Sequence, residues 1–79
     1  MKFIAEYIST LAEDGMHGAD IAKKLGVSNS MVSSYKAGSF NPSITVAKKV
    51  YMDEGIIFHP FSEESLKYEI EKDKNANTK

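Results

Sequence analysis

The 79-residue sequence contains no cysteine and no arginine, and it lacks any long uninterrupted hydrophobic run. Without cysteine, neither a disulfide framework nor a thiolate metal site can form, which fits the reducing cytoplasm as the expected location. Glu6 interrupts the apolar N-terminal stretch, so we expect neither a signal peptide nor a membrane-spanning helix. A chain of this length forms one small domain with a modest core and little room for a catalytic cleft.

The absence of arginine leaves lysine as the only permanently cationic side chain, and the lysines are unevenly distributed. The net charge of the whole chain is −1. Residues 15–50 hold five lysines against one aspartate, whereas residues 1–14 and 51–79 carry net charges of −2 and −3. The middle of the chain is therefore predicted to form a local basic face, with random clustering as the alternative.

Apolar residues recur at helical spacing in successive segments separated by glycine, serine and proline. This pattern predicts helices over residues 2–14, 18–25, 29–37 and 43–54, followed by a last helix that begins near Ser62. The apolar run "IIFHPF", residues 56–61, is compatible with a strand or with an extended connector. Residues 1–70 are expected to form one domain, and the polar residues 71–79 a flexible tail.

The segment from Gly18 to Ala37 resembles the helix-turn-helix pattern of the phage Cro and repressor family. Ala22 stands at the fifth position, where a small residue lets two helices cross closely, and Gly26 at the ninth, where the chain turns sharply. Val32, at the fifteenth position, is apolar as in that pattern. The resemblance continues through "AGSFNPSITVAKKVY". A chance match in an ordinary helical bundle is the alternative.

This resemblance implies an all-α, compact, lambda-repressor-like DNA-binding domain of four to five helices, with room for a short strand near residues 56–58. It also implies that the second helix of the motif lies in the major groove of DNA. The base-contacting candidates are then Ser28, Asn29, Ser30, Ser33 and Ser34. The candidates for contacts to DNA phosphates are His17, Lys23, Lys36, Ser39 and Asn41.

The type of these side chains indicates which bases they favour. An asparagine amide pairs with adenine through two hydrogen bonds, so Asn29 is the strongest single candidate. Serine hydroxyls bond to several bases, and the lack of arginine removes the commonest contact to guanine, so the target is expected to favour A·T pairs. The Met31 side chain suits either of two roles, contact with a thymine methyl group or packing between helices. The alternatives are that Ser28 is only a helix cap, that Ser33 and Ser34 are simply solvated, and that Lys23 and Lys24 are ordinary surface lysines.

Members of the family pair two subunits on a pseudo-palindromic operator, so we expect a homodimer on double-stranded DNA and a Cro-like repressor function. The dimerisation candidates are Ile56, Ile57, Phe58 and Phe61, unless these residues close the core of the single subunit. The alternative function is a small adaptor of the antitoxin or antirepressor type, which binds a protein through the acidic C-terminal region. We expect no catalytic residues, no cofactor, no metal and no small-molecule substrate, because the two histidines lack nearby metal-ligand partners and no nucleophile motif is present.

Overall fold

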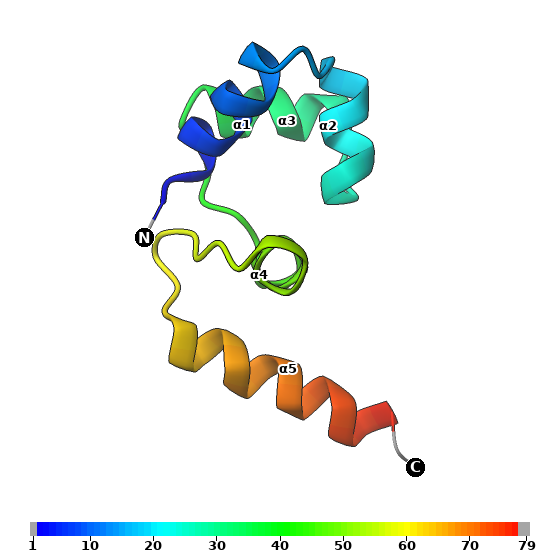
Figure 1. The fold of residues 1–79 in the computed structure, drawn as a ribbon, viewed down its shortest axis with the longest axis vertical. Coiled ribbons are helices and arrows are strands. Elements are labelled where there is room, and N and C mark those ends of the chain that lie inside the picture. Colours follow the sequence, from blue (N-terminus) through cyan, green and yellow to red (C-terminus); the bar gives the residue numbers. More distant parts are fainter. Residues whose placement is uncertain (1, 78–79) are drawn as a thin grey trace.

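The computed structural model describes residues 2–77, with side chains as far as residue 74. The helices are α1 (Ile4–Glu13), α2 (Gly18–Leu25), α3 (Asn29–Lys36), α4 (Ile44–Glu54) and α5 (Glu63–Asn77). The all-α prediction is thus confirmed, and the first four helices end within two residues of their predicted limits. The molecule is elongated, with extents of 40 × 23 × 21 Å, because α1, α2 and α3 form one group, α4 lies beside it, and α5 lies beyond α4 (Figure 1).

The main core lies where α1, α2, α3 and α4 converge. Each helix turns its apolar residues, spaced three or four apart, toward the others and leaves polar residues outside. Phe58, from the segment between α4 and α5, completes this core, and its ring lies edge-on to the ring of Tyr7 at a centroid distance of 5.2 Å. The buried cluster consists of Ile4, Tyr7, Ile8, Ile21, Ala22, Leu25, Val32, Tyr35, Val46, Val50 and Phe58.

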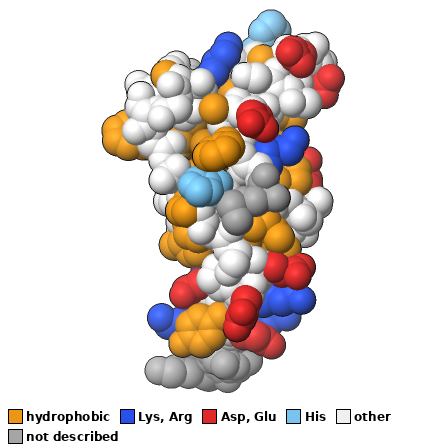
Figure 2. All heavy atoms as spheres, turned by 90° about the vertical axis from the view of Figure 1, so that its left-hand side faces the viewer, with side chains coloured by type: hydrophobic (Ala, Val, Ile, Leu, Met, Phe, Trp, Pro, Cys, Tyr) orange, Lys and Arg blue, Asp and Glu red, His pale blue; other side chains and the backbone are white. Residues whose placement is uncertain are grey.

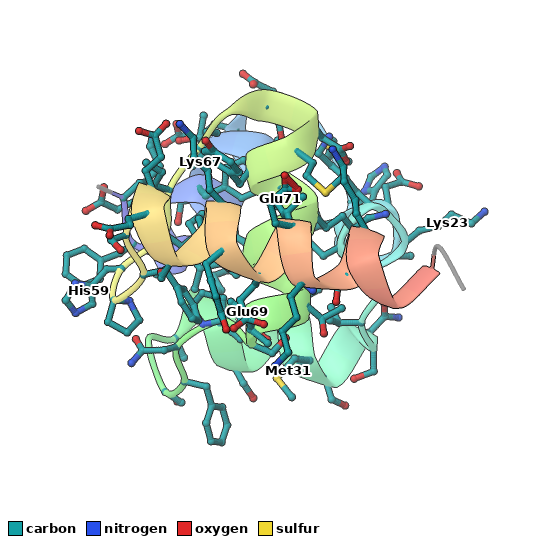
Figure 3. All side chains as sticks on the ribbon, turned by 90° about the horizontal axis from the view of Figure 1, so that it is seen from below. Lys23, Met31, His59, Lys67, Glu69 and Glu71 are labelled. Carbon is teal, nitrogen blue, oxygen red and sulfur yellow. The ribbon has the colours of Figure 1, made fainter. Side chains whose placement is uncertain are left out.

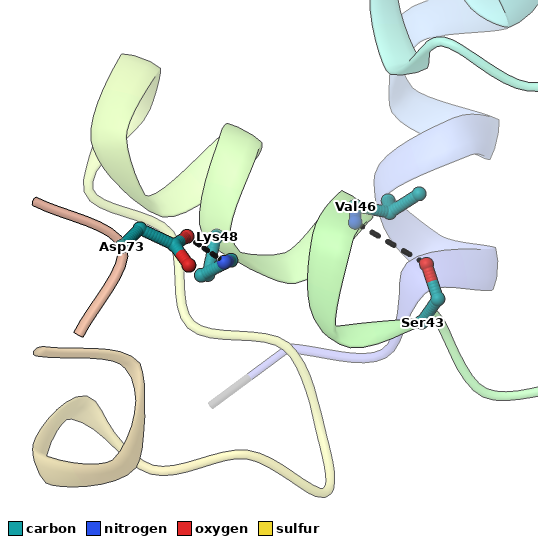
Figure 4. A network of polar contacts seen from close by, with 4 residues as sticks. All are labelled: Ser43, Val46, Lys48 and Asp73. Carbon is teal, nitrogen blue, oxygen red and sulfur yellow. Dashed lines mark hydrogen bonds and ion pairs between the residues drawn. The ribbon is translucent and has the colours of Figure 1, made fainter. Parts of the chain in front are cut away.

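Helix α4 buries residues on two sides, since it lies between the main core and α5. Val46 and Val50 join the main core, whereas Ala47 and Leu66 are fully buried outside it. Among the described helices, α5 packs against α4 alone. Two polar contacts tie them together: the Tyr51 hydroxyl donates to the Glu63 carboxylate at 3.0 Å, and Lys48 pairs with Asp73 (Figure 4). The C-terminal region is thereby held to α4 at two points along α5.

The C-terminal helix reaches into the segment for which a flexible polar tail is predicted. Residues 71–79 are that predicted tail, and α5 continues through residues 71–77. Its acidic first turn, Glu63 and Glu64, suits the helix dipole, and the Lys48–Asp73 pair holds a later turn. The last two residues, 78–79, lie outside the described part of the chain.

The segment between α4 and α5 is an extended connector, the second of the two forms predicted for it. The Lys2 N–H donates to the Ile57 carbonyl at 2.9 Å, and the His59 N–H donates to the Lys2 carbonyl at 2.8 Å. These bonds form one isolated parallel bridge, and the connector does not extend it into a strand. Phe58 is 0% exposed, as expected in the alternative that this apolar run closes the core of the single subunit.

Candidate nucleic-acid interface

The corner between α2 and α3 is built on Gly26. This residue adopts φ 73° and ψ 34°, in the left-handed region, directly after the last residue of α2. The Gly26 N–H donates to the Lys23 carbonyl at 3.3 Å and the Val27 N–H donates to the Ala22 carbonyl at 3.0 Å, which is the Schellman pattern of a helix end. A Cβ placed on Gly26 would meet no atom within 4 Å, so the backbone angle is what favours glycine here.

Helix α3 begins immediately after this corner. The Ser28 hydroxyl accepts a hydrogen bond from the Met31 N–H at 3.1 Å and so caps the first turn. Val32 and Tyr35, three residues apart on one side of the helix, are buried in the main core. These two anchors fix which side of α3 faces solvent.

The solvent-facing side of α3 carries the predicted base-contacting residues. Ser30 and Ser33 are exposed and Ser34 is half-buried, so the hydroxyls are not sealed inside the protein. Asn29, in the first turn, is also exposed, as is its neighbour Ser28. The sequence of α3 includes no carboxylate that would repel a phosphate backbone. Apart from Met31 and Lys36, the exposed residues of α3 are therefore short, neutral hydrogen-bonding groups.

Ion pairs within the protein divide the lysines of the basic middle region into two groups. Lys24 lies 3.6 Å from the Glu54 carboxylate, and Lys48 is paired with Asp73. Lys23, Lys36 and Lys49 are exposed, and within the described residues none of them forms an ion pair. In Figure 3 the Lys23 side chain extends from α2 into solvent. Both lysines predicted to contact DNA phosphates are therefore exposed and not engaged in an ion pair within the described residues.

The three other phosphate candidates lie at the ends of elements. His17 precedes α2 at its N-cap position, where its side chain makes no capping hydrogen bond. Ser39 and Asn41 are exposed in the loop between α3 and α4. This loop follows directly from α3, so those two side chains lie on the same part of the molecule as Lys36.

Two exposed aromatic residues beside α3 were not singled out from the sequence. Phe3 is 52% exposed and Phe40 is 58% exposed, and both line a shallow hollow that also includes Tyr35 and Gly38. The ring of Phe3 lies against the ring of His59 at a centroid distance of 4.7 Å. Figure 2 shows hydrophobic side chains gathered around a histidine on this side of the molecule. The sequence signal that could have identified Phe40 is the presence of an aromatic residue in the otherwise polar loop "GSFN".

One polar contact lies between the helices that support the corner. The Tyr7 hydroxyl on α1 donates to the carboxylate of Glu54 at the end of α4. Burial disfavours the phenolate, and the neighbouring carboxylate disfavours it further, so the pKa of Tyr7 is raised well above its ordinary value. Tyr7 therefore stays protonated and keeps donating across the whole neutral range.

A family model described as helix-turn-helix matches residues 11–50, about half of the chain. The chain belongs to the helix-turn-helix family. Its type is that of the Cro and repressor proteins, as the spacing of Ala22, Gly26 and Val32 predicted. A helix-turn-helix chain of this kind is a DNA-binding transcription regulator. No curated protein and no solved structure matches the sequence.

The helix-turn-helix match covers α2, α3 and most of α4 but not α5 or the connector before it. The family thus accounts for the corner and for the outward face of α3. In the part of the chain that the structure describes, no helix has the length and hydrophobicity needed to cross a membrane. Residues 2–77 also bring together no group of three or more metal-ligating side chains.

Proposed function

We propose that this chain is a sequence-specific regulator of the Cro-like repressor kind, which binds a pseudo-palindromic operator as a homodimer. The observation that carries the proposal is the division of α3 into two sides. Val32 and Tyr35 hold one side in the core, and the opposite side presents small polar groups to solvent. Apart from the cap at Ser28, the described residues form no side-chain hydrogen bond with this surface, which suits close approach to base edges in the major groove.

In this proposal the residues of α3 and its surroundings have separate tasks. Asn29 pairs with adenine, and the serines of α3 donate to or accept from neighbouring bases. Lys23 and Lys36 contact phosphates electrostatically, and these contacts position α3 without specifying sequence. Additional phosphate contacts come from His17, Ser39 and Asn41.

The dimer places two copies of α3 in major-groove segments about one helical turn apart. Ile56, Ile57 and Phe61 are each half-buried in the single subunit, so part of each side chain is available to a second copy. Phe3 extends this apolar surface through its contact with His59. A dimer on an operator that overlaps a promoter would block the polymerase, which is the simplest route to repression.

The experiment that tests the function is selection of bound sequences from a random duplex pool, followed by the double variant Asn29→Ala, Ser30→Ala. Both residues are exposed, so the variant is expected to fold normally and to lose preference for the selected operator. Enrichment of paired half-sites by the wild type supports the proposal. Unchanged site preference in the double variant would show that α3 is not the base-contacting helix.

A protein-binding adaptor predicts a different result in the same assay. A DNA-binding regulator binds random duplex loosely at low salt and releases it as salt rises, because counterions compete for the phosphates. An adaptor would bind no duplex at either salt concentration and would enrich no sequence. That outcome would overturn the proposed function.

A further inference from the structure

We propose that Met31 is a specificity-determining residue that contacts the methyl group of a thymine. This inference rests on the proposed function of α3 as the recognition helix. It goes beyond that function because it assigns a base-discriminating contact to an apolar side chain, and because it names the chemical group that is contacted.

The first observation is that Met31 lies outside the main core. It is 36% exposed, and it belongs neither to the core cluster nor to the partly buried residues that pack against that cluster. Met31 therefore keeps part of its side chain at the surface of α3, where a ligand can reach it.

The second observation is the setting of Met31 on the helix. It is the only large apolar side chain exposed on α3, where the other exposed residues are polar. Its backbone N–H donates to the Ser28 hydroxyl, which places it in the first turn. In helix-turn-helix proteins the N-terminal residues of the recognition helix contact base edges. Ser28 and Ser34, three residues away on either side, are its neighbours along the helix surface.

The chemistry of the major groove supplies one partner for such a side chain. Among the four bases, only thymine presents an apolar group there, the C5 methyl. Methionine is flexible and polarisable, so it adapts well to a methyl surface. Hydroxyls accept and donate to several bases, so the serines of α3 discriminate poorly. With no arginine in the chain, a thymine methyl contact is an effective way to add specificity.

The test replaces single thymines of the selected operator by deoxyuridine, which removes the methyl and leaves the hydrogen-bonding edge unchanged. For the wild type we expect one thymine in each half-site to be sensitive, with affinity reduced about fourfold per half-site for one buried methyl. Met31→Ala should bind the unmodified operator more weakly and should lose its sensitivity at that same position. Met31→Leu should keep it.

Met52→Ala is the matched control, because Met52 is an exposed methionine on α4. This variant should show the full deoxyuridine effect. An enriched operator that is bound equally well with deoxyuridine at every thymine would overturn the role of Met31 and leave the proposed function standing. Equal sensitivity in Met31→Ala and wild type would do the same. A pool that yields no enriched sequence would overturn the proposed function itself.

Discussion

The Tyr7 hydroxyl on α1 and the Glu54 carboxylate at the end of α4 are joined by a hydrogen bond across 47 residues of sequence. Lys24, on α2, reaches the same carboxylate at 3.6 Å. One acidic side chain therefore connects the first helix of the helix-turn-helix motif to two helices that support it. The Glu54 carboxylate thus holds α1 and α2 to α4, and α3 packs against α1 and α2.

We expect Tyr7→Phe to lower the free energy of unfolding at pH 7 by about 1 kcal/mol, because the ring remains but the hydrogen bond to Glu54 is lost. The pKa of Tyr7 is raised in the folded protein, so its contribution is complete below the ordinary pKa of 10.0 and declines above it. The difference between wild type and variant should therefore fall by about 1.4 kcal/mol per pH unit above pH 10, measured by urea denaturation.

Tyr68→Phe is the control for this experiment. Tyr68 is 65% exposed, and none of the described residues forms a hydrogen bond with its hydroxyl. Removing that hydroxyl should leave stability within about 0.5 kcal/mol of the wild type. A Tyr7→Phe difference that stays constant between pH 7 and pH 11 would contradict the raised pKa of the phenol.

Gly26 gives a second prediction, which distinguishes the effect of the backbone angle from the effect of steric crowding at this position. Gly26→Ala should destabilise the protein by about 1–2 kcal/mol, because an alanine at φ 73° is strained although its Cβ has room. Gly26→Asn should cost less, since asparagine tolerates the left-handed region. Thermal unfolding followed by circular dichroism measures both. Equal losses for the two variants would mean that conformation is not what selects glycine here.

The corner and the cap of α3 could be predicted because their signals are local. A glycine after an apolar helical repeat, followed two residues later by serine, determines the turn at Gly26 and the cap at Ser28 with little help from the rest of the chain. The burial of Val32 and Tyr35 followed from helical spacing alone. The outward side of α3, which is the candidate site, was therefore accessible from the sequence.

The relation of α5 to α4 could not be predicted in the same way, because it depends on residues distant in sequence. A polar segment such as residues 71–77 has no amphipathic pattern that predicts a helix, yet Asp73 has a partner in Lys48 on α4. For the same reason, the composition alone could not show that Lys24 and Lys48 are paired with Glu54 and Asp73. Whether Phe58 faces the core or a second copy likewise depends on the position of Tyr7.

The pairing of Lys24 and Lys48 within the protein leads to a third prediction, about salt. If Lys23 and Lys36 are the lysines that contact phosphates, a dimer should show a slope of about −3.6 in a plot of log K against log salt. Contacts from all five lysines of residues 15–50 would give about −9. Lys36→Ala should reduce the slope by about 1.8 units and weaken binding to all sequences alike.

Lys72→Ala is the matched control for Lys36→Ala. Lys72 is an exposed lysine on α5, which packs against α4 and not against α3. Fluorescence anisotropy with the selected operator at several salt concentrations measures the slopes of both variants. If Lys36→Ala and Lys72→Ala changed the slope equally, net charge and not a phosphate contact at Lys36 would explain the effect.

The dimer surface gives the fourth prediction. Ile57→Lys should weaken self-association about a hundredfold, because the two-fold arrangement would bring two uncompensated charges into one apolar contact. Sedimentation equilibrium measures the association constant, and circular dichroism confirms that the subunit stays folded. Ile57 is half-buried and contributes its backbone carbonyl, not its side chain, to the bridge with Lys2. The substitution therefore leaves that bridge in place.

Met52→Lys and Phe61→Ser complete the test of this surface. Met52 is 64% exposed on α4 and lies outside the dimer candidates, so Met52→Lys introduces the same charge without affecting association. Phe61→Ser removes an apolar side chain of the proposed surface without adding a charge, and should also weaken the dimer. If Ile57→Lys and Phe61→Ser both stayed dimeric and folded, the two subunits would have to meet elsewhere. Phe40, which is 58% exposed and lies outside this surface, would then be the next residue to vary.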